Sequence, residues 1–183
     1  VLDTAPTANV TVTITGLKTQ EGLLDTDTLT FTTANWDTPQ TVTDTGVDDS
    51  YDNGDYTYSL IATASNTGGY AGTERATTTV KNVDNDTNGV TIAQTGTNDG
   101  SGNLLTTEAG GTSTFTVVLD AQPSANVTVA ITGNDATEHS LSTDTLTFTT
   151  GNWNTPQTVT VTGVNDSIDD GDITTTLTAT ANN

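Results

Sequence analysis

The sequence predicts an all-β protein built from tandem β-sandwiches, and three observations lead to this fold class. Residues 1–66 align without a gap on residues 118–183, so that Trp36 corresponds to Trp153 at an offset of 153 − 36 = 117 positions. About two-thirds of the aligned positions are identical, which indicates a tandem repeat. Apolar residues alternate with threonine in short runs bounded by Gly, Asn, Asp and Pro, which is typical of half-buried strands. No stretch has helical periodicity.

One period of the repeat contains seven predicted strands. The second copy supplies six of them and the first copy supplies the last; they span residues 90–94, 112–119, 126–132, 145–150, 157–163 and 173–181, and 75–83. Seven short alternating strands are typical of an immunoglobulin-like sandwich, although the Cys–Trp–Cys signature is absent. One Trp per copy, Trp36 or Trp153, follows the fourth predicted strand. We expect this ring to cap the core rather than to stack on a sugar, since no second aromatic residue accompanies it.

The repeat pattern also predicts the domain organisation. Residues 1–87 are expected to form a sandwich lacking its first strands, and residues 88–183 a sandwich lacking its last strand. Both ends of the chain therefore fall within a repeat, and the first residue is Val1 rather than Met. Two explanations stay open: the chain is a piece of a longer protein, or another chain completes its sheets by strand addition.

Charge narrows the function classes. The chain has 3 Lys and Arg residues against 23 Asp and Glu residues, giving a formal net charge of −20. Nucleic acid and anionic membranes are disfavoured as partners, because both need basic residues. The absence of Cys removes disulfides and thiolate catalysis. No apolar run is long enough to span a bilayer, so we expect no membrane insertion. An extracellular or cell-surface location fits these features.

Acidic residues gather in the loop after the fifth strand of each copy, in the linker between copies, and beside the second to fourth strands. The candidate ligands for Ca²⁺ are Glu21, Asp48, Asp49, Asp52, Asp55, Asp84, Asp86, Asn88, Glu108, Glu138, Asp166, Asp169 and Asp172, with Asp170 in the same loop. Calcium prefers carboxylate, amide and carbonyl oxygens. In an immunoglobulin-like sandwich these loops lie at one end, where crowded carboxylates favour a bound cation. The alternative is a solvated acidic face with Asx turns.

The linker from Asp84 to Gly89 reads D-x-D-x-N-G, the opening of a calcium loop. The Glu that would close an EF-hand loop is Thr95, and no flanking helix is expected, so the linker is not an EF-hand.

Several short motifs resemble those of Calx-beta domains, especially the tandem repeats of large bacterial surface and repeats-in-toxin adhesins. They are the E-x-G of Glu108–Gly110, the L-T-F of Leu146–Phe148, the D-D-x-x-D-x-x-D around Asp49 and the V-x-N-V-D-N-D of residues 80–86. The resemblance implies Ca²⁺ bound by Glu108, the loop aspartates and the closing Asp84 and Asp86. Asn85 replaces the middle acid of the closing triplet, and Asn53 and Asn165 occupy acidic positions of the loops, which implies weaker binding or fewer ions.

An enzyme is not expected. The acids repeat in loops patterned like ion sites, and no nucleophile motif accompanies them. His139, the single His, replaces Gly22 of the first copy and is therefore predicted to be a surface loop residue rather than a catalytic base.

Three functions remain. The first is a calcium-binding structural repeat of an extracellular adhesin stalk, in which the ion stiffens the linker and neighbouring repeats of the same or an identical chain are the partners. The second is a subunit of a filament or sheath joined by strand exchange. The third is an adhesive module that binds a glycan or a protein.

Overall fold

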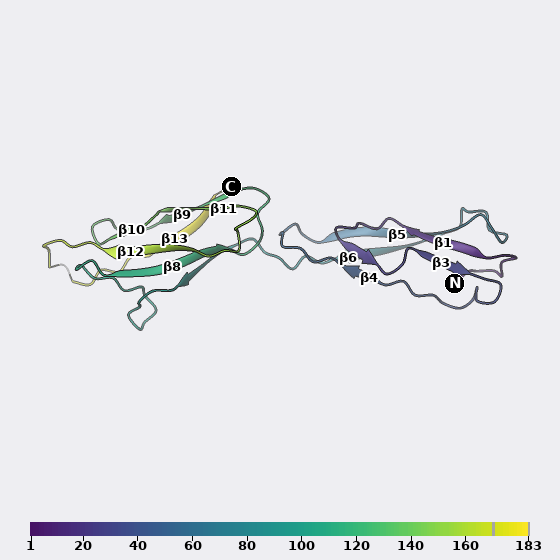
Figure 1. Ribbon diagram of the computed structural model, residues 1–183, viewed down its shortest axis with the longest axis horizontal. Coiled ribbons are helices and arrows are strands. Elements are labelled where there is room, and N and C mark those ends of the chain that lie inside the picture. The colour runs from purple at the N-terminus through teal and green to yellow at the C-terminus, as the bar shows by residue number, and fades with distance from the viewer. Residues whose placement is uncertain (170, 183) are drawn as a thin grey trace. The chain divides into compact units, whose positions relative to one another are not determined.

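The computed structural model describes residues 1–169 and 171–182 (Figure 1). These residues form strands, turns and loops without a helix, so the predicted all-β class is confirmed. In this described part there is accordingly no helix that is long and apolar enough to cross a membrane. The chain divides into two compact units, Val1–Asp49 with Asn53–Asn85 and Ser50–Asp52 with Asp86–Asn183. Each unit contains two sheets, as in a β-sandwich.

The first unit has a four-stranded and a two-stranded antiparallel sheet. Its strands are β1 (Val10–Thr15), β2 (Gly22–Leu24), β3 (Thr28–Phe31), β4 (Asp44–Gly46), β5 (Tyr56–Ala64) and β6 (Arg75–Asn82). The larger sheet has the order β3-β1-β5-β6, and the smaller one pairs β2 with β4. The alternation in β1 buries Val10 and Val12 and turns the threonines between them outward.

The second unit has a four-stranded and a three-stranded antiparallel sheet. Its strands are β7 (Val90–Gln94), β8 (Thr112–Leu119), β9 (Val127–Thr132), β10 (His139–Leu141), β11 (Thr145–Phe148), β12 (Gln157–Gly163) and β13 (Thr178–Asn182). The sheet orders are β10-β12-β8-β7 and β11-β9-β13. Each sheet contributes one face to a core that includes Phe115, Val129, Phe148 and Val159.

The turn that contains the Trp is the same in both units. The Asn35 side-chain oxygen accepts hydrogen bonds from the Thr32 amide (2.6 Å) and hydroxyl (2.9 Å), and Asn152 does the same for Thr149. The turn brings each Trp ring, half-buried, against the core of its own unit. The predicted core-capping role of the Trp is therefore confirmed.

The fifth predicted strand differs in length between the two copies, although its first four residues are identical. Residues 157–160, QTVT, belong to β12 and pair with β8. The identical residues 40–43 lie outside β4 and form no strand. The first unit has no counterpart of β8 beside this segment, so residues 40–43 form no strand ladder, although Thr43 exchanges two hydrogen bonds with Asp25. The predicted fifth strand thus forms at full length in one copy only.

The sixth predicted strand shows the reverse case. In the first unit all of Tyr56–Ala64 is β5, because β6 pairs with residues 56–63 and β1 with residues 61–64. In the second unit the prediction of a strand over 173–181 is wrong for 173–177. There β13 pairs only with β9, and no strand stands where β6 stands in the first unit.

Two short strands were not predicted. β2 and β10 have three residues each and pair with β4 and β12. Three residues are too few to display an alternating pattern, and the assignment of these strands depends on the neighbouring strand.

Candidate functional site

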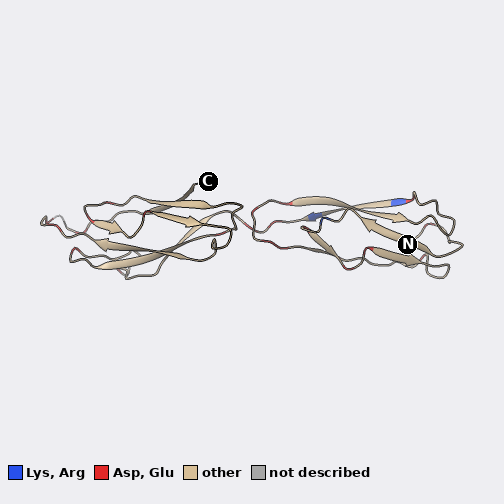
Figure 2. Cartoon of the chain, turned by 45° about the horizontal axis from the view of Figure 1, so that its top comes forward, with Lys and Arg blue, Asp and Glu red and all other residues tan. Residues whose placement is uncertain are grey.

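Acidic residues are confined to the loops of both units. Figure 2 shows Asp and Glu in red along the connections, whereas the strands are almost entirely tan. Within the strands of the described residues, Asp44 is the single acidic side chain. The sheet faces therefore carry threonine hydroxyls, and the negative charge lies where the chain turns.

In the first unit the loop after β4 and the exit of β6 are joined by hydrogen bonds. The half-buried Asp84 carboxylate accepts from the amides of Asn53 (2.9 Å) and Gly54 (2.5 Å). The Asp84 amide donates to Asp55 Oδ1 (3.0 Å), and Lys81 forms an ion pair with Asp55. The Asn53 side-chain amide donates to Asp49 Oδ2 (3.3 Å). Asp49, Asp55 and Asp84 thus belong to one network.

This network lowers the pKa of the Asp55 carboxyl. The Lys81 hydrogen bond is the larger cause, and the Asp84 amide is the next. Among the described residues, the ammonium of Lys81 makes the one salt bridge to an acidic side chain.

Glu21 lies at the same connection. The Asn82 side-chain amide donates to Glu21 Oε2 (3.3 Å) and to the Val47 carbonyl (3.0 Å), and the Val47 amide donates to the Glu21 carbonyl (3.1 Å). The exit of β6 therefore touches both the loop before β2 and the loop after β4. Asp48 is exposed in that second loop.

The acids of the linker are divided between the units. Asp84 belongs to the first unit and the half-buried Asp86 to the second. The Asn88 amide donates to Asp52 Oδ2 (2.9 Å), and both residues are counted with the second unit. In this bond Asn88 contributes its backbone, not the side-chain oxygen that a calcium ligand would use.

The second unit repeats the backbone part of this arrangement. The Val164 amide donates to the Glu138 carbonyl (2.8 Å), as Val47 does to Glu21. The Gly163 amide donates to the Gly111 carbonyl (3.0 Å), which brings the loop containing the exposed Glu108 to the end of β12.

The remaining acids of the second unit are on the loop after β12. The Asp166 side chain accepts from the Ile168 amide (2.8 Å), forming an Asx turn. Asp169 and Asp172 are exposed. Asp170 lies outside the described residues.

Hydrogen bonds thus connect the predicted loops, but the carboxylates do not converge. Within residues 1–169 and 171–182, no three His, Cys, Asp or Glu side chains are grouped closely enough to hold a metal ion. The carboxylates in the first unit are directed at backbone amides and at Lys81. A Ca²⁺ ion would have to replace these donors as the acids turned towards it.

A buried polar group that sequence reasoning missed lies between the sheets of the first unit. The Tyr58 hydroxyl donates to Asp44 Oδ2 (2.6 Å), and Asp44 Oδ1 is buried without a hydrogen-bond partner. The Tyr58 side chain is 6% exposed. Its burial, followed by the Asp44 hydrogen bond, raises the pKa of Tyr58 to about 12. Gly22 makes room for this pair, since a Cβ there would overlap with the Tyr58 hydroxyl.

The second unit has different residues at these three places. His139 replaces Gly22, Val161 replaces Asp44 and Thr175 replaces Tyr58. The prediction that His139 is a surface loop residue is wrong: it lies in β10 with 7% exposure, and its Nε2 is 3.2 Å from the Thr175 hydroxyl. The large side chain comes from the opposite sheet in each unit. Only an alignment of the two copies position by position could have signalled this exchange.

Comparison with known proteins identifies no matching family model and no similar curated sequence.

Proposed function

We propose that the chain is a structural calcium-binding repeat module of a long extracellular surface protein. In this proposal Ca²⁺ binds the acidic loops, offsets the charge of −20, and stiffens the connection between successive repeats. The resemblance to Calx-beta domains points the same way, and the chain itself is not proposed to be an enzyme.

One observation carries the proposal: in the first unit, hydrogen bonds tie the acidic loops before β2 and after β4 to the exit of β6. Asp84 and Asp55 connect the loop to that exit, and Asn82 connects it to Glu21. Repeats that are about two-thirds identical, with every acid but Asp44 outside the strands of the described residues, favour a spacer whose turns bind cations. A module that recognises specific targets would be expected to differ between repeats on its sheet faces.

The test is a thermal melt at low ionic strength with calcium, with magnesium and with chelator. An ion that binds only the folded state raises the midpoint as its concentration rises. We expect calcium to raise the midpoint more than magnesium does. An equal rise with every salt would mean that the acids are merely screened.

Matched variants make this test specific. Asp48→Asn removes one charge from the proposed site, and Asp37→Asn removes one from the Trp turn, where the second copy already has Asn154. Only Asp48→Asn is expected to reduce the calcium response. Lys81→Met, which removes the ammonium paired with Asp55, is expected to increase it.

A second candidate is a subunit of an extracellular filament joined by strand exchange. It is favoured by residues 40–42, which pair with no strand, whereas the identical residues 157–159 of the second unit pair with β8. Light scattering over a range of concentrations with calcium present tests it. A mass that stays at that of the monomer excludes the filament.

A further inference from the structure

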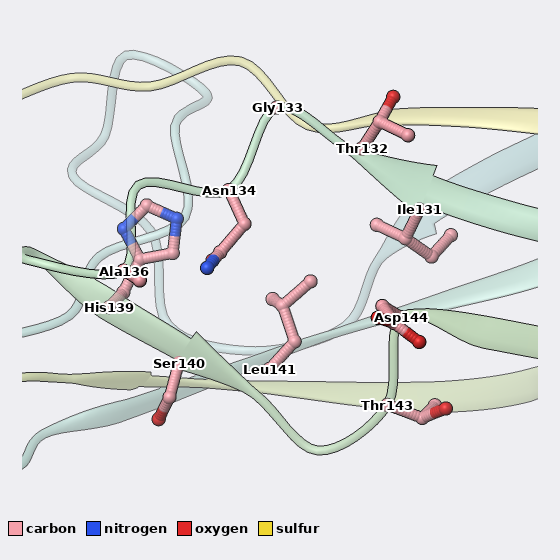
Figure 3. A pocket seen from close by; sticks show the side chains of 10 residues that line it. All are labelled: Ile131, Thr132, Gly133, Asn134, Ala136, His139, Ser140, Leu141, Thr143 and Asp144. Carbon is pink, nitrogen blue, oxygen red and sulfur yellow. The ribbon is translucent and has the colours of Figure 1, made fainter.

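A groove in the second unit lies between the end of β9 and β10. It has a volume of about 550 Å³, within the range of roughly 300–1,000 Å³ that is usual for small-molecule sites. In Figure 3 the side chains of Ile131 and Leu141 face the middle of the groove, while Asn134 and His139 stand together at one end. Asp144 lies at the opposite end.

The two copies of the repeat differ at four residues that line this groove; three of the replacements add hydrogen-bonding groups, whereas Ala136 in place of Thr19 removes one. Its apolar floor and far end are unchanged, since Ile14, Leu24 and Asp27 of the first copy correspond to Ile131, Leu141 and Asp144. The near end has changed from Leu17 to Asn134 and from Gly22 to His139, and the rim has changed from Leu23 to Ser140. All three replacements add hydrogen-bonding groups.

Maintenance of the fold does not explain the change at Asn134. Its side chain is exposed, and the first unit forms the same two strands with Leu17 at that place. At this place the half-buried Leu17 of the first unit is replaced by an exposed amide, which suits a polar ligand at the mouth of the groove. His139 is held by the Thr175 hydroxyl, so the wall of the groove is fixed in advance of binding.

We propose that this groove binds a neutral monosaccharide unit. A sugar ring has an apolar face that fits the half-buried Leu141, and hydroxyls at its edge that the Asn134 amide can bind as donor and as acceptor. Asp144 accepts the Thr145 hydroxyl at Oδ1 (3.0 Å) and retains capacity for ligand hydroxyls. The carboxylate and the charge of −20 disfavour an anion.

This proposal does not depend on calcium, so the experiment is done on the full chain in chelator and repeated with calcium. Amide chemical shifts are followed by NMR during titration with the methyl glycosides of glucose, mannose, galactose and N-acetylglucosamine. We expect at least one glycoside to bind with a millimolar Kd and to shift amides within 131–144, with no shifts at 14–27 of the first unit.

The matched variants are Asn134→Leu, which restores the residue type of the first copy, and Asn154→Leu, the same change in the Trp turn outside the groove. Asn134→Leu is expected to weaken binding at least tenfold, and Asn154→Leu to leave it unchanged. The melting midpoint checks that both variants fold. The proposal is overturned if none of the four glycosides shifts these amides at tens of millimolar, or if Asn134→Leu binds as the parent does.

Discussion

Gly22 is predicted to be coupled to Tyr58 across the two sheets of the first unit. An added Cβ at Gly22 would lie 2.7 Å from Asp44 Oδ1 and 3.1 Å from Tyr58 Cζ, and would overlap with the Tyr58 hydroxyl. Gly22→Ala therefore forces the hydroxyl away from Asp44 and breaks a 2.6 Å hydrogen bond. Asp44 Oδ2 then loses its partner, and Oδ1 has none already, so neither carboxylate oxygen is hydrogen-bonded.

The magnitude follows from these two effects. Overpacking by one methyl group costs about 1–3 kcal/mol, and a lost hydrogen bond to a charged group costs about 1.5–3 kcal/mol. Gly22→Ala should therefore lower the free energy of unfolding by about 4 kcal/mol. Tyr58→Phe, which loses the hydrogen bond without the overlap, should lower it by about 2 kcal/mol.

The double variant Gly22→Ala/Tyr58→Phe is expected to be far less destabilised than the sum of the two. Without the hydroxyl, only the contacts with Cζ and with Asp44 Oδ1 remain, so the double variant should lose about 3 kcal/mol instead of 6. Tyr56→Phe serves as the control, because Tyr56 is 41% exposed. It should change stability by less than about 0.5 kcal/mol and should add independently to Gly22→Ala.

The assay is urea unfolding followed by Trp fluorescence in a Trp153→Phe background, so that Trp36 reports on the first unit alone. If Gly22→Ala alone unfolds the first unit, a folded first unit in the double variant would equally support the packing argument. Additive free energies, with a coupling below about 0.5 kcal/mol, would refute the packing argument.

Three further predictions concern stability and dynamics. The pKa of Tyr58 is about 12 in the folded protein against 10.0 for the free residue. Its contribution to the free energy of unfolding is therefore complete below pH 10 and is lost as pH rises towards 12. Alkaline unfolding of the first unit should show this loss, and Tyr58→Phe should abolish it. Gly163→Ala places a Cβ within 2.7 Å of a backbone carbonyl carbon and should cost about 2 kcal/mol or more, whereas Gly151→Ala, whose nearest neighbour is 3.9 Å away, should be neutral; urea unfolding followed by Trp153 fluorescence in a Trp36→Phe background reads out the second unit. Amide hydrogen exchange should be slow in residues 157–159 and fast in the identical residues 40–42; equal protection of the two segments would contradict the observed pairing.

The acidic loops were partly predictable. The sequence places the acids at turns, and the sandwich topology implies that these turns are neighbours. The hydrogen bonds of Asp84 to Asn53 and Gly54 agree with that neighbourhood. Where each carboxylate points could not be predicted, because backbone amides and Lys81 compete for the same oxygens.

The sequence by itself determined the fold class and the face of each strand. Alternation decides which side chains can be buried, and a side-chain period of two residues is visible in any run long enough to show it, such as β8 or β9. The repeat, the Trp turns and the confinement of acids to loops are likewise properties of the chain alone.

Tertiary structure decided which of these runs became strands. Residues 40–43 and 157–160 have one sequence and two conformations, because backbone groups of an extended segment need a partner strand and only β8 supplies one. Residues 56–60 form a strand because β6 pairs with them, whereas the corresponding residues 173–177 have no such partner strand and form none. His139 became a buried residue because Thr175, in the segment that leads into β13, left the space that a Tyr fills in the first unit.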